Sequence, residues 1–145
     1  NFDLMNLNIL SEHHQDIYKA AFSIFLDNQI FGIGPKMFRI ECSSYISNLD
    51  PCTTHPHNFY LQILSETGLI GFFFISFFYC YLLVSFFKIF INKKHNLNII
   101  YSFALLSLLV QLFPLFPSGN FFNNWLCIIM FYSLGLFFYG KRYVK

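Results

Sequence analysis

The sequence predicts an all-α integral membrane protein, in which a helical segment outside the membrane is followed by three C-terminal transmembrane helices. Hydrophobic residues make up 56% of the 145 residues and charged residues only 11%, and the mean hydropathy is +0.52. Soluble domains usually carry about 25% charged residues, so the composition excludes an ordinary soluble protein. In addition, three long apolar runs occupy the second half of the chain, and all acidic residues precede them.

The segment before the first apolar run is predicted to contain two helices. Apolar residues at helical spacing predict an amphipathic helix over 12–27. Glycine and proline at 32–35 indicate a turn, and 37–47 is either helical or irregular. Good helix formers over 58–66 predict a short helix on the membrane surface. Gly68 ends it and leads into the first transmembrane span.

The three apolar runs are interpreted as spans over about 69–91, 99–117 and 121–139. At about 1.5 Å per residue the first reaches roughly 34 Å, which is enough to cross a hydrocarbon core of about 30 Å. The second run ends near Pro114 and Pro117, so it spans the membrane only if these prolines lie at the interface. Aromatic residues flank the third run, as is usual at membrane interfaces.

The distribution of charge orients these spans. Six of the nine basic residues lie at the end of the first span, in the loop after it or behind the third span. The positive-inside rule makes that side cytoplasmic. Residues 1–68 contain three basic and seven acidic residues, a formal charge of −4, and are expected to face a bacterial periplasm. Residues 69–145 form the membrane part. Because no signal peptide precedes this arrangement, we expect the chain to be part of a longer protein of the inner membrane.

A cluster of ionisable side chains precedes the first span. It consists of His55-Pro56-His57-Asn58, and Gly68-Leu69-Ile70-Gly71 follows after nine further residues. Histidine titrates near neutral pH, which favours a functional role for such a cluster. Two solvated loop histidines are the simpler alternative. A zinc site would need ligands from His13, His14, Cys42 or Cys52, but these have no recognisable ligand spacing, so no metal site is predicted.

Two other pairs in the outer segment have alternative interpretations. Cys42 and Cys52 lie ten residues apart in an oxidising compartment, where they can form a disulfide or remain free. Lys36 and Arg39 would share one face of a helix if that stretch is helical, and they could clamp a phosphate, since the guanidinium fork suits its oxygens. The alternative is a pair that contacts solvent or lipid headgroups. The sequence Gly32-Ile33-Gly34 lacks the remaining features of a dinucleotide-binding loop.

The pattern of a histidine followed by a Gly-x-x-Gly sequence resembles the signature of the O-antigen ligase and O-antigen polymerase superfamily. That signature is a histidine followed by Asn, Ser or Gln, nine residues, and Gly-x-x-Gly. Here it is His57-Asn58, then 59–67, then 68–71. The stretch from 27 to 39 is similar to the family segment between an amphipathic helix and the catalytic loop. The likeness covers about 11–75, and the later runs fit the family's C-terminal helices. The chain therefore resembles the C-terminal third of a larger polytopic protein.

The resemblance implies a membrane-embedded glycosyltransferase that needs no metal and no cofactor. Its donor is a glycan on undecaprenyl pyrophosphate. Its acceptor is a sugar hydroxyl of lipid A-core in a ligase, or of another lipid-linked glycan in a polymerase. The partners implied are therefore these glycolipids and the bilayer, with no nucleic acid.

The resemblance also implies roles for individual residues. His57 would be the general base that takes the proton of the acceptor hydroxyl. Arg39, with Lys36 and His14, would stabilise the pyrophosphate leaving group. Many members carry an arginine near the start of the amphipathic helix, where the nearest equivalent in this chain is Glu12-His13-His14. Either His14 replaces that arginine in part or Arg39 carries the charge. His55 would shape the loop or contact the acceptor.

Asn58 follows the implied base and has two possible roles. It could cap the short helix or orient the substrate.

Other functional classes remain open at the level of the sequence. A transporter fragment would place polar groups in mid-membrane, where these spans have almost none. A zinc-dependent module on a membrane anchor would lose activity with a chelator. A glycan-binding relative without catalytic activity is a third alternative.

Overall fold

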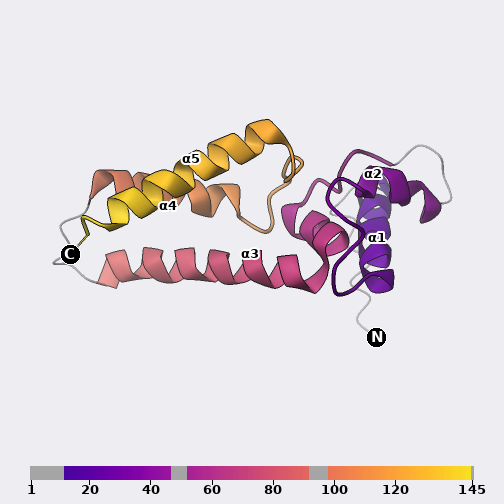
Figure 1. Ribbon diagram of the computed structural model, residues 1–145, viewed down its shortest axis with the longest axis horizontal. Coiled ribbons are helices and arrows are strands. Elements are labelled where there is room, and N and C mark those ends of the chain that lie inside the picture. The colour runs from indigo at the N-terminus through magenta and orange to yellow at the C-terminus, as the bar shows by residue number, and fades with distance from the viewer. Residues whose placement is uncertain (1–11, 47–51, 92–97, 145) are drawn as a thin grey trace.

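The computed structural model describes residues 12–46, 52–91 and 98–144, and every regular element within these ranges is a helix. The elements are α1 (Glu12–Asp27), α2 (Phe38–Glu41), the short 3-10 helix η2 (Cys42–Ser44), α3 (Phe59–Ile91), α4 (Ile99–Gln111) and α5 (Asn124–Lys141). Figure 1 shows α3, α4 and α5 extending together along the long axis, with α1 and α2 at one end beside the bent start of α3. The all-helical part of the predicted fold class is thus confirmed.

Helix α1 has the predicted bounds and forms a small core with α2. Its residues Ile17, Ala21 and Ile24 are buried together with Phe38 and Cys42. The spacing of these apolar residues on α1 is that of an amphipathic helix with one buried face. The region after the glycine turn, which the sequence left undecided, is the short pair α2 and η2.

Helix α3 is sharply bent at Gly68, which has φ 65° and ψ −161°. The bend leaves backbone N–H and carbonyl groups on both sides of Gly68 without hydrogen-bond partners in the helix. Residues 29–34 provide partners for these groups. The N–H of Leu69 donates to the Gln29 carbonyl at 2.8 Å, and the Gly34 N–H donates to the Glu66 carbonyl at 2.9 Å. The approach is close: a Cβ on Gly68 would lie 2.3 Å from the Ile30 carbonyl oxygen. The first glycine of the motif therefore joins a short helix to a long one.

We expect Gly68→Ala to destabilise the protein strongly. A non-glycine residue in this region of φ/ψ space costs on the order of 1–3 kcal/mol, before the clash with the Ile30 carbonyl is counted. Gly135→Ala is the matched control, because a Cβ on Gly135 meets no atom within 4 Å. Thermal unfolding of the full-length parent protein in detergent measures both variants. Equal melting temperatures would contradict the role assigned to Gly68.

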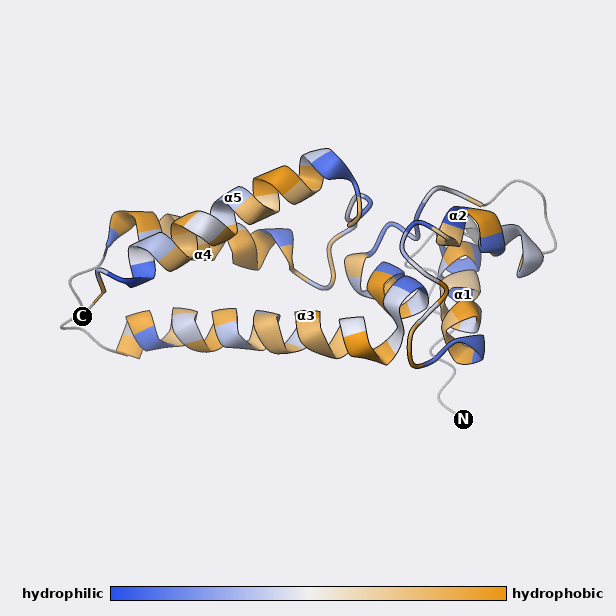
Figure 2. Cartoon of the chain, viewed as in Figure 1, coloured by the Kyte–Doolittle hydropathy of each residue, from blue (hydrophilic) through white to orange (hydrophobic). Residues whose placement is uncertain are grey.

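The three long helices form a second core and expose much apolar surface. Leu82 of α3, Leu105 and Leu108 of α4 and Phe137 of α5 are fully buried. Large side chains such as Phe74, which is 77% exposed, point away from this core. Figure 2 shows hydrophobic residues along all three helices and polar residues gathered at their ends. Continuous exposed apolar surface of this kind indicates contact with lipid or with further helices.

One helix among the described residues is long and apolar enough to cross a membrane, over Phe59–Ile89. The helices in the other two predicted spans are shorter than the spans themselves, which stay a prediction. Helix α4 ends at Gln111 rather than near 117, because Pro114 lacks an N–H and disfavours helix in the residue before it. With 13 residues it is about 20 Å long. Helix α5 begins at Asn124 rather than 121, because the Asn123 side chain caps it by accepting from Trp125 N.

Candidate functional site

The loop between α4 and α5 is tied to the start of α3 and brings distant residues together. The N–H of Ser118 donates to the His57 carbonyl at 2.9 Å, and the Tyr60 hydroxyl donates to the Leu112 carbonyl at the same distance. Burial raises the pKa of that hydroxyl, which therefore stays protonated and able to donate. The candidate site lies at this junction, beside α1 and α2.

Asn58 forms hydrogen bonds with both parts of this junction, the start of α3 and the α4–α5 loop. Its Oδ1 accepts from the N–H groups of Tyr60 at 3.0 Å and Leu61 at 3.1 Å, as an N-cap does. Its Nδ2 donates to the Pro114 carbonyl at 2.8 Å. The side chain thus caps α3 and fixes the loop at the same time, which leaves its role towards a substrate a prediction.

Three histidines gather beside this junction. The ring centroids of His55 and His57 are 4.3 Å apart, and those of His14 and His57 are 5.8 Å apart. His14 comes from α1 and the other two from the loop before α3, so the fold brings together residues that are far apart in sequence. Two of the three were expected to be close; the proximity of His14 follows from the packing of α1 against α3.

The backbone at the site is strained at two positions. Within the described ranges, Lys36 and His57 are the two non-glycine residues with positive φ, at 65° and 54°. Such conformations are uncommon outside glycine and concentrate at functional sites, where the surrounding structure enforces them. Both residues were candidates from the sequence. The strain therefore supports a functional interpretation of these two positions.

His55 is held in a partly buried position. Its Nδ1 lies 2.9 Å from the Thr54 hydroxyl, and its carbonyl accepts from the Thr53 hydroxyl at 2.7 Å. The buried Nε2 lies near the Ser118 backbone and makes no hydrogen bond of normal geometry. Burial lowers the pKa of His55, and the charge that His57 can carry lowers it further, while the Ser118 backbone acts in the opposite direction. His55 is therefore expected to be neutral at pH 7.

A polar cavity of about 640 Å³ lies next to the histidines. Its lining includes Lys36, Arg39 and His55, together with Asn120 of the α4–α5 loop and Trp125 of α5. The two cations were expected to share a helix face only if the stretch that carries them was helical. Instead Lys36 precedes α2 and Arg39 lies within it, and they converge on one cavity. Side chains of this kind can donate several hydrogen bonds to an anion such as phosphate.

A buried network centred on Glu66 holds the walls of this cavity in place. Glu66 is fully buried in the first part of α3. One carboxylate oxygen accepts from the N–H of Phe38, the residue before Arg39, at 2.9 Å, and the other accepts from Gln62 Nε2 at 3.1 Å. Gln62 Nε2 also donates to Asn120 Oδ1 at 2.8 Å, and Gln62 Oε1 accepts from Phe121 N at 2.8 Å. Glu66 therefore connects the start of α2, through Gln62, with the α4–α5 loop, which also lines the cavity.

We expect Glu66→Gln to weaken this arrangement. The new amide NH₂ would face either the Phe38 N–H or the Gln62 amide, so one buried donor would lose its acceptor, at a cost of roughly 1–3 kcal/mol. Glu41→Gln on α2 is the control, since that carboxylate is partly exposed and outside the network. The measurements are the melting temperature and the KM for the lipid-linked donor. A positioning role predicts a lower melting temperature and a higher KM for Glu66→Gln alone.

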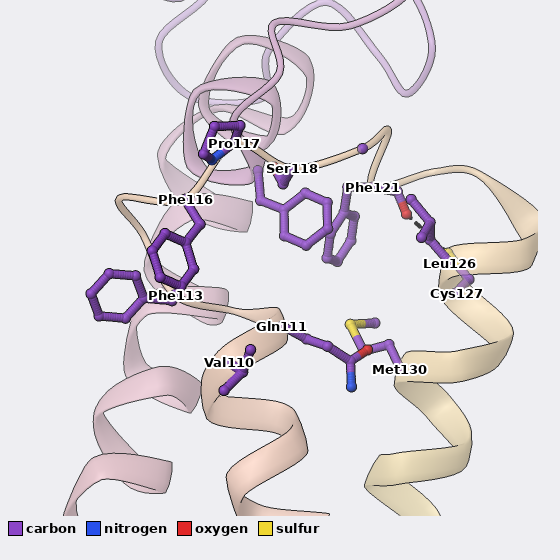
Figure 3. Close-up of a pocket in the computed structure, with 12 residues that line it drawn as sticks. Val110, Gln111, Phe113, Phe116, Pro117, Ser118, Phe121, Leu126, Cys127 and Met130 are labelled. Atoms are coloured by element: carbon purple, nitrogen blue, oxygen red, sulfur yellow. Dashed lines mark hydrogen bonds between the residues drawn. The ribbon is translucent and has the colours of Figure 1, made fainter. Parts of the chain in front are cut away.

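An apolar cavity of about 300 Å³ adjoins the polar one, and both are lined by Gly119 and Leu126. Figure 3 shows its lining: phenylalanines of the α4–α5 loop lie above Gln111 of α4 and Met130 of α5. Cys127 Sγ donates to the Phe121 carbonyl at 2.9 Å on the same side. The two cavities together form a polar space next to an apolar one, which suits an amphiphilic ligand.

The structure joins Cys42 and Cys52 in a disulfide, with their Cα atoms 5.8 Å apart. The link ties η2 to the loop that carries the histidines. No group of three or more His, Cys, Asp or Glu side chains in the described ranges is arranged to hold a metal ion. Metal independence stays a prediction, which a chelator tests.

Residues 11–76 match the sequence model of the O-antigen ligase family. This segment is therefore similar to the O-antigen ligase family. The expected family relationship is thereby confirmed. Comparisons with curated proteins and with solved structures found no match.

The O-antigen ligase segment contains all the site residues proposed from the sequence, but only part of the cavity. Asn120 and Trp125 lie outside the matched residues and were missed, because no motif marks them. Gln62 and Glu66 lie within it and were also missed. The sequence feature that could have identified Gln62 and Glu66 is their spacing. They are two polar side chains four residues apart, on the same face of a short helix that is otherwise largely apolar.

Proposed function

We propose that the chain is part of a glycosyltransferase that moves a glycan from undecaprenyl pyrophosphate to a sugar hydroxyl of lipid A-core. The observation that carries this proposal is the convergence of Lys36, Arg39 and His55 on one polar cavity, with the ring of His57 4.3 Å from that of His55. The family match supports the same class of reaction. The adjoining apolar cavity supports a donor that has a charged group and a hydrocarbon chain.

In the proposed reaction, the acceptor hydroxyl attacks the anomeric carbon of the donor sugar. The neutral His57 imidazole takes the hydroxyl proton as the new carbon–oxygen bond forms. The bond from the anomeric carbon to the phosphate oxygen breaks, and undecaprenyl pyrophosphate leaves with that electron pair. Arg39 and Lys36 stabilise the negative charge that grows on the leaving group. His14 and His55 contact the reactants or orient His57.

The proposed membrane placement follows from the same family and from the charge distribution. The part of α3 after Gly68 crosses the bacterial inner membrane, and α4 and α5 with their flanking loops complete the three C-terminal spans. Residues 1–68 then lie on the periplasmic side, together with the site. In this proposed placement the short part of α3 before the bend at Gly68 lies at the membrane surface.

An O-antigen polymerase would use the same site with a different acceptor, a second lipid-linked glycan. The two activities differ in the molecule that provides the hydroxyl, and the residues proposed for the chemistry serve both.

Genetic complementation with the full-length parent gene tests the proposal and distinguishes the two activities. The gene is expressed in cells that lack their own O-antigen ligase and, separately, in cells that lack their polymerase. The surface glycolipids are then separated on a gel. Attachment of glycan to lipid A-core in the ligase mutant supports the ligase. A ladder of chain lengths in the polymerase mutant would support the polymerase instead, and restoration of neither would contradict the proposal.

A further inference from the structure

A third cavity lies at the end of the helical bundle that is far from the histidines. It has a volume of about 260 Å³ and is lined by Tyr81, Ser85 and Lys88 of α3, Tyr101 of α4 and Lys141 of α5. Lys88 and Lys141 come from the last turns of their helices. Two cations from separate helices therefore converge on one small space.

In this cavity, side chains on one face of α3 lie next to Lys141 of α5. Tyr81, Ser85 and Lys88 follow one another at intervals of four and three residues, so they lie on the same face of α3. Lys141 Nζ donates a hydrogen bond to the Tyr81 hydroxyl and lies 4.8 Å from the centre of that ring. The Tyr81 hydroxyl keeps its own proton to donate, and an ammonium group has three donors in all.

No carboxylate of the same region compensates these charges. The sequence contains no acidic residue after Glu66. In the described part of the chain the one ion pair is Lys19 with Asp16, on α1 at the opposite end. The anion that neutralises Lys88 and Lys141 must therefore come from another molecule or another part of the protein.

We propose that this cavity binds the phosphate of an anionic phospholipid headgroup. Two ammonium groups and a tyrosine hydroxyl would donate to the phosphate oxygens, and basic pockets between membrane helices are suited to such headgroups. Exposed apolar residues of α3 at the same end, Phe87 and Ile91, offer a surface for the acyl chains. The proposal rests on α3 crossing a membrane, and it is independent of the transfer reaction at the other end.

Native mass spectrometry of the full-length parent protein tests the proposal, with phosphatidylglycerol, zwitterionic phosphatidylethanolamine and inorganic phosphate as separate probes. The variants are the double substitution Lys88→Gln with Lys141→Gln and, as control, Arg142→Gln, which removes an exposed cation that does not line the cavity. Each lysine near an anionic headgroup contributes a factor of about five in binding, so the double variant should bind phosphatidylglycerol about 25-fold more weakly. The control should bind it as the wild type does.

Three results would overturn the proposal. Equal binding of phosphatidylglycerol to the wild type and the double variant would remove the lysines from the site. Equal occupancy by phosphatidylethanolamine would show that the headgroup charge is not recognised. Competition by inorganic phosphate at the same concentration would identify a site for a free anion. Since no glycan donor is present, none of these results bears on the transferase activity.

Discussion

Replacing His57 with alanine is expected to reduce glycan transfer by about 10²- to 10⁴-fold, the range typical of general-base assistance. The sugar hydroxyl is a poor nucleophile, and loss of the imidazole leaves no positioned group to take its proton. The measurement is the rate of product formation by the full-length parent protein, with donor and acceptor at saturating concentrations. The donor KM should change much less than this rate.

The backbone at His57 requires a second variant. Its φ of 54° is strained for alanine, so a loss of activity in His57→Ala could reflect a displaced loop. Asparagine adopts positive φ more readily and cannot act as a base near neutral pH. His57→Asn should therefore be as inactive as His57→Ala while melting close to the wild type. A transfer rate within threefold of the wild type in His57→Asn would remove His57 from its proposed role.

Arg39→Ala is expected to reduce transfer by about 10²- to 10³-fold, as removal of one preorganised group at a developing negative charge does. Arg39→Lys should also be impaired, though less, because an ammonium group cannot donate the two parallel hydrogen bonds of a guanidinium. Both variants are assayed for transfer with the same lipid-linked donor.

Lys19→Gln is the control for Arg39, because it removes a cation that pairs with Asp16 on the exposed face of α1. It should transfer glycan at the wild-type rate. If Arg39→Lys is as active as Lys19→Gln, recognition by a bidentate guanidinium is wrong. If Arg39→Ala is as active too, the polar cavity does not hold the leaving group.

The parts of the fold that were predictable from the sequence depend on local patterns. Apolar residues at helical spacing predicted helix α1. A glycine after a short run of helix formers predicted the point at which α3 bends. The bounds of α4 were not predicted well, because hydropathy continues past Gln111 while the backbone geometry around Pro114 does not permit a helix. Hydropathy reports composition, whereas the end of a helix depends on individual hydrogen bonds.

The candidate site was predicted only in part for a similar reason. His55, His57, Lys36 and Arg39 stood out as rare residue types in an apolar chain. Asn120 gave no such signal, since its place in the cavity depends on the hydrogen bond from Gln62, 58 residues earlier. Contacts between distant segments depend on tertiary packing, which a single sequence does not specify.

The most direct test of the central claim is the release of undecaprenyl pyrophosphate by the purified full-length parent protein, with and without acceptor and in the presence of a chelator. The account predicts release that requires the acceptor, persists with the chelator and is lost in His57→Asn. Each molecule released should be matched by one glycan joined to the acceptor. Release at the same rate in His57→Asn, or no release from the wild type with either class of acceptor, would contradict the proposed site.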